Sequence, residues 1–337
     1  MKNPRAASSS VAALLLAWYA RGHRDLPWRG TCDPYRIWIS EIMLQQTRAQ
    51  AVIPYYQRFL DRFPTVEALA AAAEEEVLTL WSGLGYYSRA RNLLRAARSI
   101  VAAGAFPSTC SALRELPGIG DYTAAAIASI AFEEPCAVLD GNVLRVVARV
   151  ENDPSDIGSP RIRERFRSVA EAWLDPQHPG AFNQALMELG ATVCLPRNPL
   201  CLLCPLVSCC RAREYGTVLQ LPVKRRRTEP VALEEVLFIV RSRRGVLLRR
   251  RDPDARRMAG FWDLPSPRDL PSARAGRTLG AFRHTITHHH FTFIVNEAQA
   301  RPRTASGPLR WFHPSECLEI PLSTTARKGL KLARVLA

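Results

Sequence analysis

The chain has 337 residues, of which 47% are hydrophobic, and that is enough apolar material for two domains with sizeable cores. No apolar run approaches the ~18 residues that a membrane helix needs, so no membrane span is expected. The formal net charge of +15 is uneven, with +2 on residues 1–215 and +13 on residues 216–337. Such a basic balance favours polyanionic partners.

The N-terminus superficially resembles a signal peptide, because Lys2 and Arg5 precede an apolar stretch. Trp18 and Tyr19, followed at once by Arg21, fit an amphipathic first helix better. The nine cysteines also lack the spacing of a disulfide framework. We therefore expect a cytoplasmic protein.

Residues 34–63 read as helical with a polar break at residues 45–47. Glu41 lies among Ile37, Trp38 and Ile42, on or near the apolar face. Burial there raises the pKa of a carboxyl group, which suits a general acid near neutral pH. The alternative is a structural glutamate paired with an arginine, and these residues alone favour that alternative.

An alanine-rich helix is expected over residues 65–81. It is followed by Ser-Gly-Leu-Gly-Tyr-Tyr-Ser-Arg-Ala-Arg at residues 82–91. Glycines beside tyrosines and arginines are typical of a loop that lies against DNA and inserts a wedge into the base stack. A helix–helix turn with buried tyrosines is the alternative.

A glycine hairpin follows at Leu116-Pro-Gly-Ile-Gly120. A helical segment over residues 111–116 stops at Pro117, Asp121 is a plausible N-cap, and residues 123–132 read as a helix. The free amides at such a helix start can bind a DNA phosphate. An ordinary turn between two helices is the alternative.

Asp140 follows an apolar run and precedes Gly141, so it is predicted to cap a helix beginning at Val143. A helix N-terminus would keep this carboxylate ionised. A neutral Glu41 and a charged Asp140 are the pair that cleavage of a glycosidic bond uses.

Four cysteines have the spacing C-x6-C-x2-C-x5-C: Cys194, Cys201, Cys204 and Cys210. This spacing predicts a metal centre, either structural zinc or a four-iron cluster. Cys209 adjoins Cys210, so spacing alone leaves the fourth ligand ambiguous.

Together these motifs resemble the adenine DNA glycosylases of the MutY type, in the helix-hairpin-helix superfamily that includes endonuclease III. The resemblance covers nearly the whole chain and is densest in residues 26–29, 38–47, 81–93, 116–120, 139–143, 182–190 and the cysteine loop. It implies a mainly α helix-hairpin-helix glycosylase domain over residues 1–215 with a [4Fe-4S] loop at residues 194–210. The family's x6, x2, x5 spacing selects Cys210 over Cys209.

The resemblance also implies roles. Glu41 would protonate the leaving adenine, and Asp140 would stabilise the cationic sugar, through a covalent intermediate, with help from Asn142 and Tyr122. The remaining matches bind substrate, in the adenine pocket, in the gap left in the duplex or at the hairpin: Arg29, Leu44, Glu188, Gln46, Thr47, Leu84, Tyr86, Gly118 and Gly120. Base extrusion is needed because the bond is inaccessible within the stack.

Bifunctional glycosylase/lyases of this superfamily use a lysine amine, which in endonuclease III lies two residues after the second hairpin glycine. Tyr122 stands there, and no lysine occurs between Asn3 and Val223. A monofunctional enzyme is therefore favoured over an endonuclease III-type lyase for oxidised pyrimidines. A non-catalytic DNA-binding iron-sulfur protein is the third class, and Glu41 together with Asp140 argues against it.

Residues 216–230 read as a linker, because Lys224 begins a four-residue basic run beside prolines. Strands are expected at residues 236–240 and 246–248, as a hairpin, and at 290–295 and 309–312, with a closing helix over 324–336. With Gly260-Phe-Trp-Asp-Leu-Pro265, this layout resembles the α+β Nudix-like domain of the family, over residues 231–337. The acidic helix of Nudix hydrolases is absent, so recognition rather than hydrolysis is implied.

In the family this domain reads 8-oxoguanine opposite the adenine, and the aligned residues are Ile286, Thr287 and His288. Thr287 and His288 are thus implied to bind substrate, although the family's aromatic residue is replaced by Ile286. The resemblance implies double-stranded DNA with A:8-oxoG or A:G mispairs as partner. It also implies a monomer associated with the bacterial nucleoid.

Overall fold

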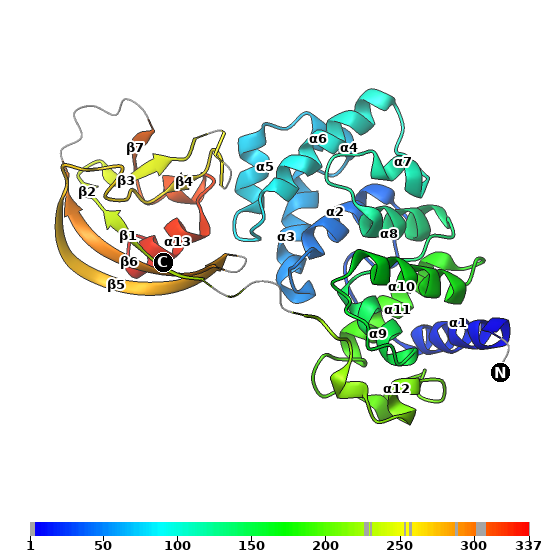
Figure 1. The fold of residues 1–337 in the computed structure, drawn as a ribbon. Coiled ribbons are helices and arrows are strands. Elements are labelled where there is room, and N and C mark those ends of the chain that lie inside the picture. Colours follow the sequence, from blue (N-terminus) through cyan, green and yellow to red (C-terminus); the bar gives the residue numbers. More distant parts are fainter. Residues whose placement is uncertain are drawn as a thin grey trace. The chain divides into compact units, whose positions relative to one another are not determined.

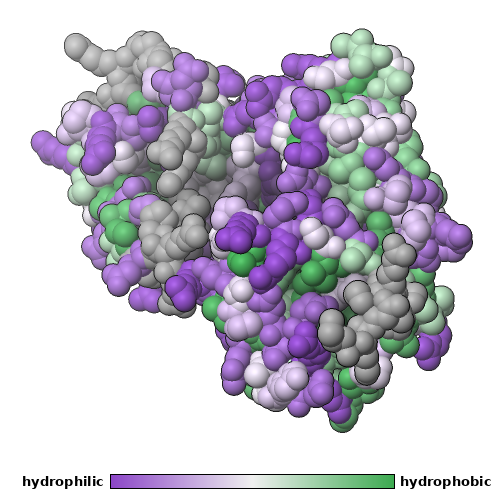
Figure 2. All heavy atoms as spheres, turned by 45° about the vertical axis from the view of Figure 1, so that its right-hand side comes forward, coloured by the Kyte–Doolittle hydropathy of each residue, from purple (hydrophilic) through white to green (hydrophobic). Residues whose placement is uncertain are grey.

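The computed structural model describes residues 4–225, 229, 231–252, 254–255, 258–286, 289–300 and 308–336. They form two compact units (Figure 1), one of Met1–Ala71 and Asn92–Arg225, the other of Ala72–Arg91 and Arg226–Ala337. No helix among the described residues has the length and apolar character to cross a membrane. Hydrophilic side chains predominate on the face drawn in Figure 2.

The first unit is helical, as predicted. Its elements are α1 (Pro4–Arg21), α2 (Pro34–Leu44), α3 (Ala49–Arg62), α4 (Val66–Ala70), most of α6 (Ser88–Ala103), α7 (Cys110–Arg114), α8 (Asp121–Phe132), α9 (Gly141–Val150), α10 (Pro160–Trp173), α11 (Pro179–Thr192), η1 (Cys201–Leu203), α12 (Arg211–Glu214) and η2 (Val218–Gln220). The predicted break at residues 45–47 separates α2 from α3. The single helix predicted over residues 65–81 is instead two, α4 and α5 (Glu74–Trp81).

Helix α8 is the central helix of this unit. Residues 123–130 are all buried, and most are small, so α2, α7 and α11 can pack closely against it. Helix α2 begins where the Asp33 carboxylate accepts the Tyr35 amide at 2.9 Å, with Pro34 in the first turn. Its face from Ile37 to Met43 is buried, which carries Glu41 into the interior.

The hairpin differs from the prediction at its cap. The N-cap of α8 is Gly120, with no side-chain cap, and Asp121 is the first helical residue. The Asp121 carboxylate instead pairs with Arg114 Nε at 2.9 Å and Arg167 Nη2 at 3.0 Å, and these ion pairs hold it away from the backbone amides. Gly118 has φ +79°, and a Cβ there would lie 2.5 Å from the Asn92 Cβ, so the tight turn requires glycine.

The second unit contains two sheets. Their strands are β1 (Val231–Ile239), β2 (Arg241–Ser242), β3 (Gly245–Arg250), β4 (Trp262–Asp263), β5 (Arg274–Ile286), β6 (His289–Gln299) and β7 (Leu309–Phe312). One sheet has the order β1-β6-β5, with β1 parallel to β6 and β5 antiparallel to it. The other has the order β2-β3-β4, with β7 also paired to β3.

The predicted strands are present, and so is a hairpin turn directly before Gly245, with Leu247 N–H donating to Val240 O at 3.0 Å, but residues 236–239 do not form the first strand of that hairpin. Strand β1 pairs with β6, and the short β2 takes its place beside β3. Strand β5 was not predicted from the sequence. The closing helix α13 (Thr324–Leu332) ends earlier than expected, because Ala333 is its C-cap.

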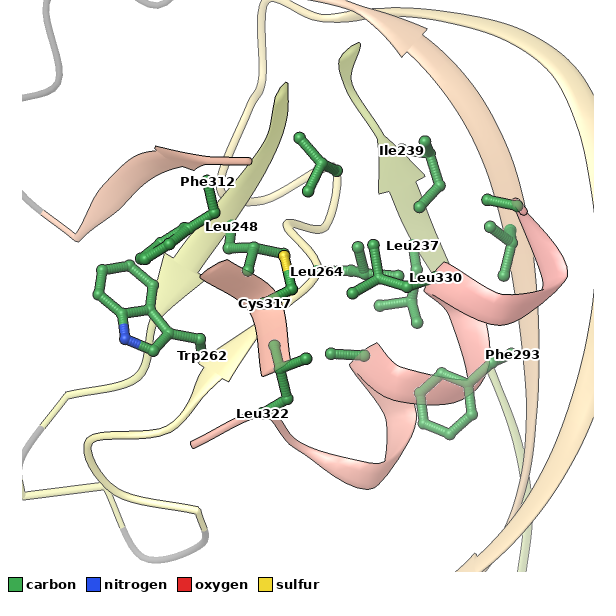
Figure 3. Close-up of a cluster of buried hydrophobic side chains, with 14 of the residues drawn as sticks. Leu237, Ile239, Leu248, Trp262, Leu264, Phe293, Phe312, Cys317, Leu322 and Leu330 are labelled. Atoms are coloured by element: carbon green, nitrogen blue, oxygen red, sulfur yellow. The ribbon is translucent and has the colours of Figure 1, made fainter. Parts of the chain in front are cut away.

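The core of the second unit lies between α13, η3 (Glu316–Leu318) and the sheets (Figure 3). Phe293 and Val295 of β6 point into it, as the predicted alternation requires. This core supports the β5–β6 hairpin. Thr287 and His288, the predicted 8-oxoguanine readers, lie outside the residues that the structure describes.

Candidate active site

A cavity of about 1030 Å³ opens in the first unit. Its walls come from α2, the segments around residues 24–29 and 44–50, α8, the start of α9, and α11. Nine residues predicted from the sequence line it: Arg29, Glu41, Leu44, Gln46, Thr47, Tyr122, Asp140, Asn142 and Glu188. Segments more than a hundred residues apart in the chain thus converge on one space.

Glu41 is only 5% exposed, and its burial raises the pKa of the carboxyl to about 7. The Tyr122 hydroxyl donates a hydrogen bond to Glu41 Oε2 at 2.6 Å and also lies 3.1 Å from Met187 Sδ. That hydrogen bond lowers the pKa of Glu41, and the nearby Asp140 raises it. The partner of Glu41 is therefore a tyrosine rather than the arginine of the alternative interpretation.

Asp140 is the N-cap of α9, as predicted, but the helix begins at Gly141 rather than at Val143. Its Oδ1 accepts the Val143 amide at 2.7 Å, and its Oδ2 accepts the Asn142 side-chain amide at 2.9 Å. Burial raises the pKa of Asp140, and these donors oppose the rise. The sequence predicted that the helix N-terminus would keep Asp140 ionised, but burial has the larger effect and raises its pKa.

A third acidic group in the cavity, Glu188, has the opposite environment. Arg24 donates to both Glu188 oxygens, with Nη2 at 2.6 Å from Oε2, and Arg29 Nη2 also lies 2.6 Å from Oε2. Burial alone would raise the pKa of Glu188, but these hydrogen bonds lower it to about 2. Glu188 is therefore ionised at neutral pH, whereas the pKa of Glu41 lies near neutrality, so that Glu41 can carry a proton there.

Arg145 connects the Asp140 site to the cysteine loop. Its Nη2 donates to Asn142 Oδ1 and to Gly190 O, both at 2.8 Å, and its Nε donates to Cys194 O at 2.7 Å. Gly190 allows α11 to approach Asn142 closely, because a Cβ at that glycine would lie 2.5 Å from the Asn142 Cβ. One buried guanidinium thus orients the amide that holds Asp140.

The four predicted cysteine ligands line one small cavity together with Arg149: Cys194, Cys201, Cys204 and Cys210. Cys209 does not line it and hydrogen-bonds to Leu206 O at 3.4 Å. Among the described residues no three His, Cys, Asp or Glu side chains are arranged to hold a metal ion. Burial, reinforced by the neighbouring cysteines, raises the pKa of Cys204 to about 12.

The other predicted residues lie outside the active-site cavity. Gly118 and Gly120 form the hairpin, while Leu84 and Tyr86 belong to the second unit, with Leu84 buried and Tyr86 48% exposed. Several cavity residues were not predicted: Arg24, Gln45, Arg163, Gln184 and Met187. All of these except Arg163 had a sequence signal, since each stands in or beside a segment that was already singled out.

Residues 39–172 match the model of the HhH-GPD superfamily of base excision DNA repair proteins. Curated relatives include the adenine DNA glycosylases of Mus musculus, 49% identical over 209 residues, and of Arabidopsis thaliana, 40% identical over 294 residues. These alignments cover 59% and 75% of this chain but only 41% and 46% of the relatives. The chain thus spans less than half the length of these two relatives.

A bacterial relative, the adenine DNA glycosylase of Buchnera aphidicola subsp. Baizongia pistaciae, is 38% identical, with 67% of this chain and 65% of the relative covered. Among solved structures, a thermostable thymine-DNA glycosylase matches with a TM-score of 0.55 and 29% identity, covering 62% of this chain and 97% of its own. An endonuclease III–DNA complex matches with a TM-score of 0.53 and 20% identity, covering 64% and 99%, and shares the helical fold.

Proposed function

We propose that the chain is a MutY-type adenine DNA glycosylase of the helix-hairpin-helix superfamily, a DNA N-glycosylase that removes adenine from duplex DNA; the match of residues 39–172 to that superfamily and the similarity to adenine DNA glycosylases support this. The observation that carries this proposal is the pairing of Glu41, with a pKa of about 7, and the hydrogen-bonded Asp140 at one cavity. Two carboxyl groups in unlike environments are what acid-assisted cleavage of a glycosidic bond requires.

In the proposed reaction, neutral Glu41 donates its proton to the adenine as the bond between base and deoxyribose breaks. The bonding electrons leave with the base, and positive charge develops on the sugar. The Asp140 carboxylate, oriented by Asn142 and the Val143 amide, stabilises that charge through a covalent intermediate. Water then completes the substitution, and the Glu41 carboxylate takes up the proton that the water releases.

The ionised Glu188 and its two arginines would recognise the extruded adenine. Glu188 Oε1 is engaged only by Arg24 among the hydrogen bonds described, and carboxylate oxygens accept from an exocyclic amino group. Arg24 and Arg29 hold the carboxylate in place and keep it charged. Leu44 supplies apolar contact at the same wall.

We propose a monofunctional enzyme. The side chain at the position of the lyase lysine is Tyr122, whose pKa is raised far above its ordinary value by burial. A neutral phenol cannot form the Schiff base that strand cleavage by a lyase requires. The substrate proposed is adenine opposite 8-oxoguanine or guanine, with the Nudix-like second unit reading the opposite base through Thr287 and His288.

The cavity lined by Cys194, Cys201, Cys204 and Cys210 is proposed to hold a [4Fe-4S] cluster. The four cysteines line one shared space, and their x6, x2, x5 spacing is that of the cluster loop in the family that the chain resembles. When bound, the cluster would supply coordination that keeps the four sulfurs deprotonated and the loop folded. We further propose that the protein acts as a monomer in the bacterial cytoplasm, associated with the nucleoid.

A strand-nicking assay tests this proposal with a duplex carrying one adenine opposite 8-oxoguanine. Excision leaves an abasic site, so nicking should appear mainly after hot alkali, and it should be lost in Glu41→Gln. Nicking without alkali that equals the alkali-treated amount would support the lyase reading instead. Release of an oxidised pyrimidine but no adenine would contradict the proposed substrate.

A further inference from the structure

The loop between α5 and α6, Ser82 to Tyr87, has an unusual backbone. Gly83, Gly85 and Tyr86 all have positive φ, at +110°, +73° and +49°. Glycine adopts this region freely, but a tyrosine does so only at a cost in free energy. Something in the surroundings must therefore hold Tyr86 in its conformation.

Arg89 supplies much of that support. Its Nη2 donates to Leu84 O at 3.2 Å and to Gly85 O at 3.1 Å. The guanidinium carbon lies 5.4 Å from the centroid of the Trp81 ring and 5.7 Å from that of Tyr86. Trp81 Nε1 donates to the same Gly85 O at 3.2 Å, so ring and guanidinium fix the turn together.

The side chain is buried although it is charged. Arg89 is 8% exposed, and burial lowers its pKa to about 10, which leaves it protonated at neutral pH. A buried guanidinium needs acceptors for its donors, and two carbonyl oxygens of the loop accept from Nη2 here. Tyr86 is meanwhile 48% exposed, so the loop holds an aromatic side chain out toward solvent.

We propose that Arg89 is a positioning residue for Tyr86: it holds the backbone of residues 84–86 in the turn that presents the Tyr86 ring to a DNA base stack. This inference rests on the proposed function, in which a flipping enzyme must fill or widen the gap that the extruded base leaves. A turn that is already formed lowers the conformational cost of inserting the Tyr86 ring. Arg89 therefore assists the opening of the base stack and not the cleavage of the glycosidic bond.

The test compares two duplexes under single-turnover conditions. Both contain adenine opposite 8-oxoguanine, and the second also has a mismatch on each side of that adenine, which unstacks it in advance. Arg89→Met, which keeps an unbranched stem but removes the donors, should slow excision on the first duplex roughly tenfold or more. On the pre-opened duplex the loss should be less than about threefold, because stacking is no longer the obstacle.

Tyr86→Ala should reproduce this selectivity, and Arg89→Lys should restore part of the rate, because an ammonium can donate to one of the carbonyls. Arg58→Met, which removes an exposed arginine of α3, is the matched control and should leave both rates unchanged. Equal losses on the two duplexes, or no loss on the first, would overturn the role of Arg89.

A second readout keeps this inference separate from the proposed function. The fluorescence of 2-aminopurine placed beside the adenine reports unstacking without any excision. If the unaltered chain excises nothing, the proposed activity fails, but the fluorescence still decides the role of Arg89. Binding of the unaltered chain should raise the fluorescence and binding of Arg89→Met should not; the same rise with both proteins would refute the positioning role.

Discussion

Glu41, the residue that we propose as the acid, should destabilise the folded protein at high pH, because its pKa is raised. The carboxyl has a pKa of about 7 in the folded chain against an ordinary value of 4.5. Because the folded state binds this proton more tightly, the unaltered protein loses stability as pH rises from about 4.5 to 7. A difference of about 2.5 units corresponds to about 3 kcal/mol.

Glu41→Gln keeps the shape of the side chain and cannot ionise. We therefore expect the variant to lose excision yet to gain stability over the unaltered protein by about 3 kcal/mol at pH 8, less what the altered Tyr122 hydrogen bond costs. The gain should shrink toward zero near pH 4.5. Urea unfolding of both proteins at several pH values measures the difference, with Glu75→Gln on an exposed part of α5 as control.

The reasoning fails if the difference in unfolding free energy between Glu41→Gln and the unaltered chain is the same at pH 5 and pH 8. Burial would then not disfavour the charged form. A difference that grew as pH fell would indicate a lowered pKa, and Glu41 could not act as an acid near neutrality.

Three further results are expected. Excision should decline as pH rises through about 7, because Glu41 then loses its proton. Tyr122→Phe should move that decline to higher pH, because the tyrosine hydrogen bond favours the ionised form of the Glu41 carboxyl. A single-turnover pH profile measures both effects, and a shift to lower pH would contradict the assignment of Glu41 as the acid. Asp121→Asn frees the two arginines paired with it, so DNA should bind more tightly, with a salt dependence steeper by roughly one to two units in the log–log slope; an unchanged slope would mean that these arginines do not meet phosphate. Cys210→Ser should lose the brown colour and visible absorbance of an iron-sulfur protein, whereas Cys209→Ser should keep them. Equal loss in both variants would contradict the assignment of Cys210, rather than Cys209, as the fourth ligand.

The sequence predicted best what depends on near neighbours in the chain. The burial of Glu41 follows from the apolar periodicity of α2, and the capping role of Asp140 follows from the glycine and the helix after it. The cysteine spacing likewise anticipated four side chains around one cavity. Each of these signals occupies a short stretch and needs no knowledge of the rest of the fold.

Features that depend on distant partners could not be predicted. Arg145 has an ordinary place on α9, and only the packing of α11 brings Gly190 and Cys194 within its reach. Strand β1 pairs in parallel with β6, more than fifty residues later, so no local turn signalled the arrangement. Asp121 was predicted to be a cap because its pairing with Arg167, a residue of the distant helix α10, could not be inferred from the neighbouring sequence.

Gly190, which lies outside the cavity, restricts the position of the first turn of α9. Its hydrogen atom faces Asn142, and the Cα of that asparagine would lie 3.1 Å from any added methyl group. Even alanine would have to push the first turn of α9 outward, and the carboxylate at its head would move with it. Gly190 does not line the cavity, yet on the proposed function Gly190→Ala should lower excision in a chain that still folds, because it would displace Asp140.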